Sequence, residues 1–487
     1  MIIFMPEMKI EEAFAIVSRA PYLFSDEEIN EFEFDVNQFY DNGIKPMTLE
    51  MLYISRWGIL PQKELRHAPD LVLIRNNNVV SDTCAMCWIL KNKSLPPKDL
   101  LHAPGIRSRT GYTCAMLYIM VCKTLPPDEL LHDPSICTDL GQTCADLYLI
   151  YVDVPIPIKL IPSYNFNTAE LWIRRRRSLP QKELRHNSVE LSKSWITYVR
   201  TIPPEEIRPK YSNQSGSNGM TCAMWWIYIM RSLPPKELLH KASLQDNNGM
   251  TCAMYWIKYC HSAPPKELLH DVSLQDNNGE TCAMWWIKCC HSAPPKELLH
   301  DPIICNNAGY TLAMLYIIKC KGSLPKELLH SSELKDIYSK QTCAMRWIAT
   351  RNALPPKDIL HNPLCKDICG MTCAMWWIKM MNSLPPKELL HDPCVTDMFG
   401  YTCAMHFIES CKSLPPKELL HDPKIQTTGA GFTCAMLWIM TIKTLPPIEL
   451  MHDPNIRTIN ERKETLCDIW RRVVKTEPPK EIIPHTL

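Results

Sequence analysis

DVSLQDNNGETCAMWWIKCCHSAPPKELLH, residues 271–300, decides the fold, because it repeats the thirty residues before it. Residues 241–270 read KASLQDNNGMTCAMYWIKYCHSAPPKELLH, and the two segments are identical at 25 of 30 positions. Such a match between adjacent segments indicates internal duplication and sets the repeat length at 30 residues. A chain of tandem repeats grows by stacking units, without enlarging a single core.

The same pattern recurs along most of the chain, and the threonine of Thr-Cys-Ala-Met marks each copy. Clear units begin every 30 or 31 residues within each unbroken run, at Thr83, Thr113, Thr143, Thr221, Thr251, Thr281, Thr311, Thr342, Thr372, Thr402 and Thr433. Weaker units begin at Thr48, Thr168, Glu190 and Thr465. We therefore expect about fifteen units. The predicted division is a non-repeat cap (1–47), a first set of repeats (48–162), degenerate repeats with a possible kink (163–218), regular repeats (219–464) and a C-terminal capping repeat (465–487).

The sequence pattern of one unit predicts two short helices and a loop. Thr372 is a suitable N-cap, and Cys373–Met381 contains no turn residue and is apolar almost all round. Prolines in the segment 385–390 suit the first turn of a second helix, which we expect to run for about two turns. The segment 394–400 then predicts extended chain and a turn. Helices this short are marginal alone, so the units must be stabilised by their neighbours.

Bulk composition excludes several classes of protein. Lys plus Arg is 53 and Asp plus Glu is 52, so no basic field for nucleic acid is expected. The longest apolar runs, such as Cys114–Cys122, are far shorter than the roughly 20 residues of a membrane span. The N-terminal residues lack the basic start of a signal peptide. The 23 cysteines in so long a chain favour a reducing compartment over a secreted disulfide scaffold. We expect a cytoplasmic monomer.

The unit resembles the ankyrin repeat. Asp246, Gly249, Thr251 and Ala253 match the start of that family's pattern, and the leucines at 268–269 look like those of its second helix. The unit departs from the family in two ways. It has 30 residues, whereas the ankyrin repeat usually has about 33, and it has Thr-Cys-Ala-Met in place of Thr-Pro-Leu-His. The predicted fold is an all-α repeat solenoid, an ankyrin-like stack of helix-turn-helix units joined by turn-bearing loops. The alternative is another α-α solenoid. The resemblance implies a binding scaffold without a cofactor.

Two columns of cysteine and histidine raise the question of a metal array. Each unit offers one of each, as Cys373 and His391 do, whereas structural zinc needs about four converging ligands. Leu312 replaces the cysteine in its unit, which indicates an apolar position. The histidines suit a structural role at the end of the second helix, where they can bond free carbonyls. We expect no metal or cofactor site, and the absence of known catalytic motifs predicts no catalytic residue.

Candidate partner-binding residues are those that vary between otherwise regular units. The fifth position of a unit accepts very different side chains, and the loop tips also vary. Candidates are Tyr255, Arg346 and His406 at the fifth position, and Asn247, Asn248, Asn277, Asn278 and Phe399 at the tips. The predicted function is a non-enzymatic protein–protein interaction scaffold, and a structural spacer without a specific ligand is the alternative.

Overall fold

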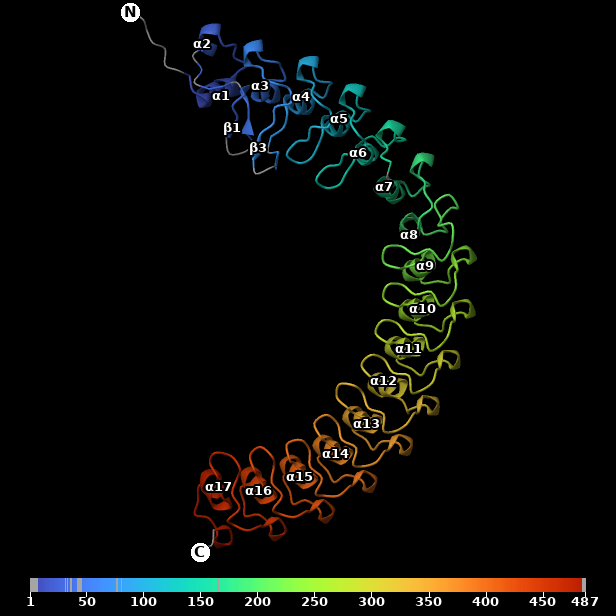
Figure 1. Ribbon diagram of the computed structural model, residues 1–487, viewed down its shortest axis with the longest axis vertical. Helices are drawn as coiled ribbons and strands as arrows, with labels where there is room; N and C mark the ends of the chain where they lie inside the picture. The colour runs from blue at the N-terminus through green and yellow to red at the C-terminus, as the bar shows by residue number, and fades with distance from the viewer. Residues whose placement is uncertain are drawn as a thin grey trace, which may run out of the picture. The chain divides into compact units, whose positions relative to one another are not determined.

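The computed structural model describes residues 8–30, 32, 34–35, 37–41, 46–75, 78–79, 81–163 and 166–483. The chain separates into two compact units, Met1–Gln214 and Ser215–Leu487. Each is a row of short helices in which every repeat helix packs against the next (Figure 1). The predicted all-α repeat solenoid is therefore confirmed.

The helices of the first unit are α1 (Ile10–Arg19), α2 (Asp26–Asn30), α3 (Leu49–Trp57), α4 (Cys84–Asn92), α5 (Cys114–Cys122), α6 (Cys144–Tyr151), α7 (Phe166–Arg176) and α8 (Val189–Tyr198). Those of the second are α9 (Cys222–Met230), α10 (Cys252–Cys260), α11 (Cys282–Cys290), α12 (Leu312–Lys319), α13 (Cys343–Arg351), α14 (Cys373–Met381), α15 (Cys403–Cys411), α16 (Cys434–Ile442) and α17 (Leu466–Val473). Two short antiparallel pairs lie in the first unit, β1 (Tyr40–Asp41) with β2 (Pro46–Met47) and β3 (Ile74–Arg75) with β4 (Asn78–Val79).

The repeat helix begins and ends for local reasons that α11 illustrates. The hydroxyl of Thr281 accepts a hydrogen bond from the backbone N–H of Met284 at 3.3 Å, which caps the first turn as predicted. His291 adopts the left-handed conformation, with φ of 53°, and ends the helix. The Ala-Met pair and the isoleucine after it are fully buried between neighbouring helices. A helix apolar on nearly every side is thus covered from both directions along the stack.

The second helix is much shorter than predicted. In place of about two turns, all units but the one that begins at Glu190 have a single 3-10 turn of three residues, as at Lys296–Leu298. The preceding Pro295 has ψ of 152° and the following Leu299 has ψ of 138°, so both flanking residues are extended. Proline also disfavours helix in the residue before it, which keeps the first proline of the pair from starting a longer helix. The fourteen turns are η1 (Lys63–Leu65), η2 (Lys98–Leu100), η3 (Asp128–Leu130), η4 (Ile158–Leu160), η5 (Lys182–Leu184), η6 (Lys236–Leu238), η7 (Lys266–Leu268), η8 (Lys296–Leu298), η9 (Lys326–Leu328), η10 (Lys357–Ile359), η11 (Lys387–Leu389), η12 (Lys417–Leu419), η13 (Ile448–Leu450) and η14 (Lys480–Ile482).

Both ends of the chain carry helices that differ from the regular pattern. In the first unit, α1 packs against α3, and Phe14, Val17 and Tyr53 share a small apolar cluster. In the second unit, α17 carries Arg471 on an exposed position while Trp470 is buried against the preceding repeat.

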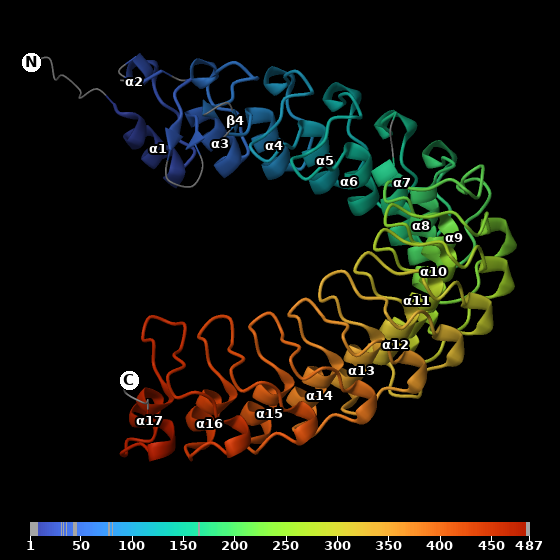
Figure 2. The ribbon, with the colours of Figure 1, turned by 60° about the horizontal axis from the view of Figure 1, so that its bottom comes forward.

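The loops of the second unit lie side by side on the side of the helices away from the 3-10 turns (Figures 1 and 2). One backbone hydrogen bond joins each tip to the next, as where the N–H of Asn307 donates to the carbonyl of Asn278 at 3.0 Å. Gly279 has φ of +76°, and a Cβ added there would lie 2.7 Å from the backbone nitrogen of Asn307. Glycine is therefore required both by the turn and by the approach of the next loop.

We expect Gly279→Ala to destabilise the second unit by more than about 1 kcal/mol, because alanine is strained at positive φ and its methyl group displaces the next loop. Urea unfolding followed by circular dichroism, with hydrogen exchange at the Asn307 amide, measures both effects. Gly429→Ala is the matched control, since Gly429 has no positive φ and nothing lies within 4 Å of its added Cβ. Equal stability of the two variants would contradict the role given to Gly279.

Candidate functional site

A threonine, a histidine and a cysteine form a contact that repeats along the chain. The Thr251 hydroxyl lies 2.8 Å from Nε2 of His270, and Sγ of Cys282, in the next repeat, lies 3.5 Å from the same nitrogen. Nδ1 of His270 lies 2.7 Å from the carbonyl of Asp271. Because a carbonyl only accepts, Nδ1 carries the proton and Nε2 accepts from the threonine. The histidine thus connects the start of its own helix to the helix of the next repeat.

Contacts of this kind between histidine and the next repeat's cysteine join His67 to Cys84, His102 to Cys114, His132 to Cys144, His240 to Cys252, His270 to Cys282, His330 to Cys343, His361 to Cys373, His391 to Cys403 and His421 to Cys434. Leu312 and Leu466 fill the cysteine position after His300 and His452, and both leucines are fully buried. The thiol therefore occupies an apolar position, as the sequence predicted, and burial raises the pKa of Cys282 to about 12.

Burial also lowers the pKa of ten of these histidines, despite the opposing hydrogen bond that each makes to a backbone carbonyl. They are His102, His132, His240, His270, His300, His330, His361, His391, His421 and His452. A neutral imidazole is the form that the folded chain stabilises, because a second proton on Nε2 would remove the acceptor for the threonine.

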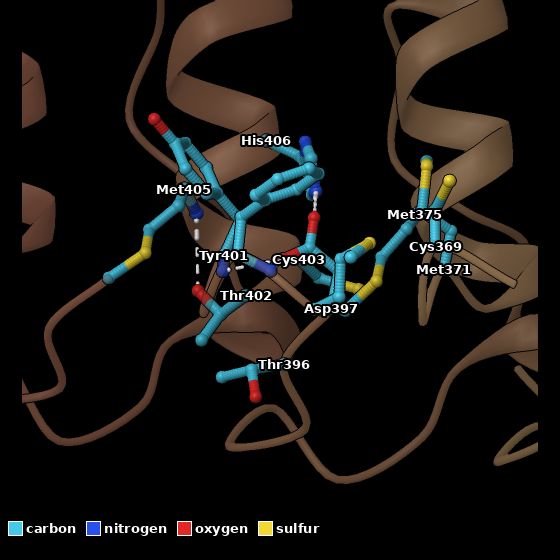
Figure 3. Close-up of polar contacts among 12 residues, drawn as sticks. Cys369, Met371, Met375, Thr396, Asp397, Tyr401, Thr402, Cys403, Met405 and His406 are labelled. Atoms are coloured by element: carbon cyan, nitrogen blue, oxygen red, sulfur yellow. Dashed lines mark hydrogen bonds and ion pairs between the residues drawn. The ribbon is translucent and has the colours of Figure 1, made fainter. Parts of the chain in front are cut away.

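In several units, the fifth position carries a side chain that bonds an aspartate in the loop. Nε2 of His406 lies 3.1 Å from Oδ2 of Asp397, and Figure 3 marks this contact with a dashed line. Burial acts to raise the pKa of Asp397, but hydrogen bonds from His406 and from backbone amides outweigh it and hold that pKa below its usual value. In the same way, the hydroxyl of Tyr255 donates to Asp246 at 2.8 Å.

These contacts explain why the fifth position tolerates such different residues. Trp285 and Trp376 donate to their loop aspartates through indole N–H groups, and Arg346 donates to Asp336 through its guanidinium at 3.1 Å. Where the loop carries an aspartate, any donor long enough to reach it suffices. Leucine takes the fifth position in units whose loop has another residue in place of the aspartate, as Leu315 does beside Asn306. Tyr255 is only 6% exposed, so most of its side chain is removed from the surface. The loop aspartate, nine residues before Tyr255 in the sequence, is the partner that sequence reasoning missed.

The candidate asparagines occupy the loop tips in two different ways. Nδ2 of Asn277 donates to the carbonyl of Asn247 at 2.8 Å, and Asn247 makes the equivalent bond to the preceding loop. Asn248 and Asn278 are also exposed, and their carbonyls accept the backbone bond from the following loop. The first pair therefore holds neighbouring tips together, while the second lies on the exposed side of each turn.

Later loops replace the tip asparagine with apolar residues. Ile337, Ile368, Met398 and Ile459 take the position of Asn277 in their units, and Tyr338 and Phe399 follow two of them. We call these six residues the tip strip. Their exposed fractions range from 50% for Ile337 to 69% for Tyr338. Backbone bonds of 2.9 Å from Ile368 and Met398 to the preceding loops keep adjacent members of the strip together.

A hollow of about 680 Å³ adjoins the strip between the tips and the helices. Asn278, Trp285, Tyr310, Tyr338 and Arg346 line it, so Tyr338 belongs to both features. The Arg346 guanidinium carbon lies 4.8 Å from the centre of the Tyr310 ring, and Nη2 donates to the tyrosine oxygen at 3.0 Å. The structure thus brings two sequence candidates, Asn278 and Arg346, to one hollow, while Phe399 lies on the strip.

No protein-family model and no curated protein matches the chain. Among solved structures, one similar chain is the ankyrin repeat domain of Bcl-3, described as a unique member of the IkappaB protein family. It is 15% identical, with a TM-score of 0.25, and the match covers 36% of this chain and 85% of that one. Another is the ankyrin repeat protein EF0377, which is 16% identical, with a TM-score of 0.21 and coverage of 39% and 94%. Both are ankyrin-repeat proteins, the family that the sequence resembles. The all-α stack itself is established by this chain's own helices and their successive contacts.

Within the part of the chain that the structure describes, no helix is both long enough and apolar enough to cross a membrane. No disulfide joins any of the 23 cysteines, all of which lie in the described part of the chain.

We expect stability to fall as the pH is lowered below about 6.5, the ordinary pKa of histidine. The folded-state pKa values are lower, so the unfolded chain binds more protons in this range and the free energy of unfolding decreases with falling pH. The slope approaches about 1.4 kcal/mol per pH unit for each histidine that stays neutral only when folded.

Urea unfolding between pH 7.5 and pH 5 measures this slope before most carboxylates titrate. His270→Gln is the control, because its amide can still bond Thr251 but does not titrate, and we expect it to lower the slope by the share of one histidine. A stability that stays constant over this range would contradict the neutral state of the column.

Proposed function

We propose that the chain is a non-enzymatic protein-interaction scaffold, a cytoplasmic monomer whose second unit binds a protein partner along the tip strip and the adjoining hollow. The observation that carries this proposal is the tip strip, where five large apolar side chains are exposed on three adjacent loops and Ile459 lies two loops further along, beyond Thr428. Contiguous exposed apolar patches on soluble proteins mark interaction sites. The free thiols are consistent with a reducing compartment.

The residue types around the hollow support the same proposal. Tyrosine, tryptophan and arginine are the side chains most enriched among residues that dominate binding energy. Lys288 and Arg346 are paired with Glu280 and Asp336, which leaves Lys319 as the lining cation without a described ion pair. We infer that recognition there depends on shape and apolar contact, and not on a strongly acidic partner.

The ladder of backbone bonds gives the proposed surface its rigidity. Each tip is fixed by one bond to its neighbour, and the loop aspartates fix the turn through backbone amides, as Asp397 does for Phe399 at 2.9 Å. A surface that is ordered before binding loses less conformational entropy when the partner arrives. We propose that Asn248, Asn278 and Phe399 contact the partner. In this proposal Asn247, Asn277, Tyr255 and His406 position the loops.

The proposal also assigns a role to each segment of the chain. We propose that residues 1–47 and 465–487 cap the two ends of the array, and that residues 163–218 form degenerate repeats between two sets of regular ones. The binding surface then lies within residues 219–464.

We expect the double variant Ile368→Asp, Phe399→Asp to lose a partner captured by the full-length chain, with at least a tenfold reduction in the recovered amount. Both residues are well exposed, so charge at these positions disrupts apolar contact without disturbing the core. Affinity capture at physiological salt with quantitative mass spectrometry measures the loss. Ile448→Asp is the matched control, because Ile448 is 84% exposed but lies on a 3-10 turn away from the tips.

A stoichiometric partner that both variants retain would place the interface outside the tip strip. The absence of any stoichiometric partner for the unaltered chain would contradict the scaffold and favour the structural spacer. Circular dichroism of all three proteins establishes that the substitutions leave the helices intact.

A further inference from the structure

Glu50 is a buried carboxylate at a position that the clear units fill with alanine. It lies in α3, two residues after the N-cap Thr48, where Ala85 and Ala115 stand in the next two units. Its side chain is 1% exposed, and that of the neighbouring His67 is 0% exposed. A carboxylate removed from water in this way is costly unless a counter-charge or a full set of hydrogen bonds compensates it.

The hydrogen bonds of Glu50 are incomplete. Oε2 accepts from the backbone N–H of His67 at 3.0 Å. Oε1 is buried and has no hydrogen-bond partner among the described residues, although the carboxylate lies beside the thiol of Cys84. A buried oxygen without a donor is the kind of group that a bound ion would satisfy.

Three atoms of different residues converge at this point. Oε2 of Glu50 lies 3.4 Å from Nε2 of His67, and Sγ of Cys84 lies 3.5 Å from the same nitrogen. All three ligand atoms lie within 4.8 Å of one another. Zinc bonds of about 2.0 Å to nitrogen and oxygen and 2.3 Å to sulfur, arranged tetrahedrally, separate ligand atoms by roughly 3.3 to 3.5 Å. Both distances that meet at His67 therefore match those of a tetrahedral zinc ion.

The histidine is already oriented as a metal ligand. Nδ1 of His67 lies 2.8 Å from the carbonyl of Ala68, which places the proton on Nδ1 and leaves the lone pair of Nε2 toward the cluster. The hydroxyl of Thr48 donates to this lone pair at 2.7 Å, so a bound ion would replace that hydrogen bond. The other histidine–cysteine contacts of the chain share this orientation, but their units have alanine or another residue in place of Glu50. The carboxylate is what makes this contact a set of three ligands.

We propose that Glu50, His67 and Cys84 supply three of the four ligands of a zinc ion that connects the first repeat to the second, and that a water molecule takes the fourth position. Glu50 lies in α3, His67 follows η1 by two residues, and Cys84 is the first residue of α4. The ion would therefore join two helices that already pack together. The donor set of one thiolate, one imidazole and one carboxylate suits zinc better than magnesium or calcium, which take oxygen ligands. Cys84 would bind as the thiolate, so the proton of its thiol is released to solvent when the ion binds.

The test uses the full-length chain, stripped of metal by a chelator and kept reduced, with Co²⁺ as a spectroscopic probe for the zinc position. We expect a thiolate-to-cobalt charge-transfer band that saturates at one equivalent and disappears when Zn²⁺ is added. Glu50→Ala restores the residue found in the neighbouring repeats, so it preserves the packing, and we expect it to lose that equivalent. Cys114→Ala is the control, since Cys114 contacts His102 in a unit that has Ala85 in place of the acid.

Loss of the cobalt equivalent in Glu50→Ala but not in Cys114→Ala supports the site. Uptake of cobalt that is the same in the unaltered chain and in Glu50→Ala overturns it, because the ion would then be held by other thiols. Failure of the unaltered chain to bind either ion also overturns it. Circular dichroism of each variant separates loss of binding from loss of folding.

Discussion

The apolar surface of each repeat helix is buried against the equivalent helices of the adjacent repeats. With only nine residues, and with alanine, methionine and isoleucine on most sides, α11 has no stability of its own. The helices α10 and α12 pack against α11 and bury its apolar side chains, and each of them is buried in turn by the next helix along the row. The histidine that joins a threonine to the cysteine of the following repeat, and the backbone bond between adjacent tips, set the spacing at which this burial occurs. Every regular position in the unit serves that spacing.

Function is therefore to be found where the chain departs from its own repeat. Glycine at the tip and threonine at the N-cap recur because the stack requires them, and neither distinguishes one unit from another. The tip strip differs, since Ile368 and Met398 take a position that holds asparagine in earlier units. Glu50 differs in the same sense, as a charged residue at a small apolar position. Neither the tip strip nor Glu50 is required for stacking. The other units show which residue stacking alone selects, which is asparagine at the tip and alanine at the position of Glu50.

Local signals in the sequence predicted much of this architecture. The threonine cap, the buried cysteine and the glycine turn each have a short-range physical cause that one unit displays. The predicted length of the second helix was wrong. A proline pair can start either a helix or an extended segment, and the outcome depends on how Leu298 reaches the core. The fifth position was interpreted as a surface position because it varies. Its contact with Asp397 or Asp246 crosses nine residues and follows from the path of the loop, which the pattern of one unit does not reveal. The pattern of one unit does not predict a role for Glu50, because its unit is a weak copy and the convergence with Cys84 spans two repeats.

The bonds between tips have a mechanical consequence. Each repeat of the second unit is fastened to its neighbours by the same small set of contacts, and few contacts in it connect repeats that are farther apart. Tension applied along this row therefore acts on the contacts of one repeat at a time. A unit of 30 residues that is pulled free extends by about 100 Å before the next one bears the load. The row would lengthen in steps of nearly equal size, and behave as a spring with a limited number of discrete extensions.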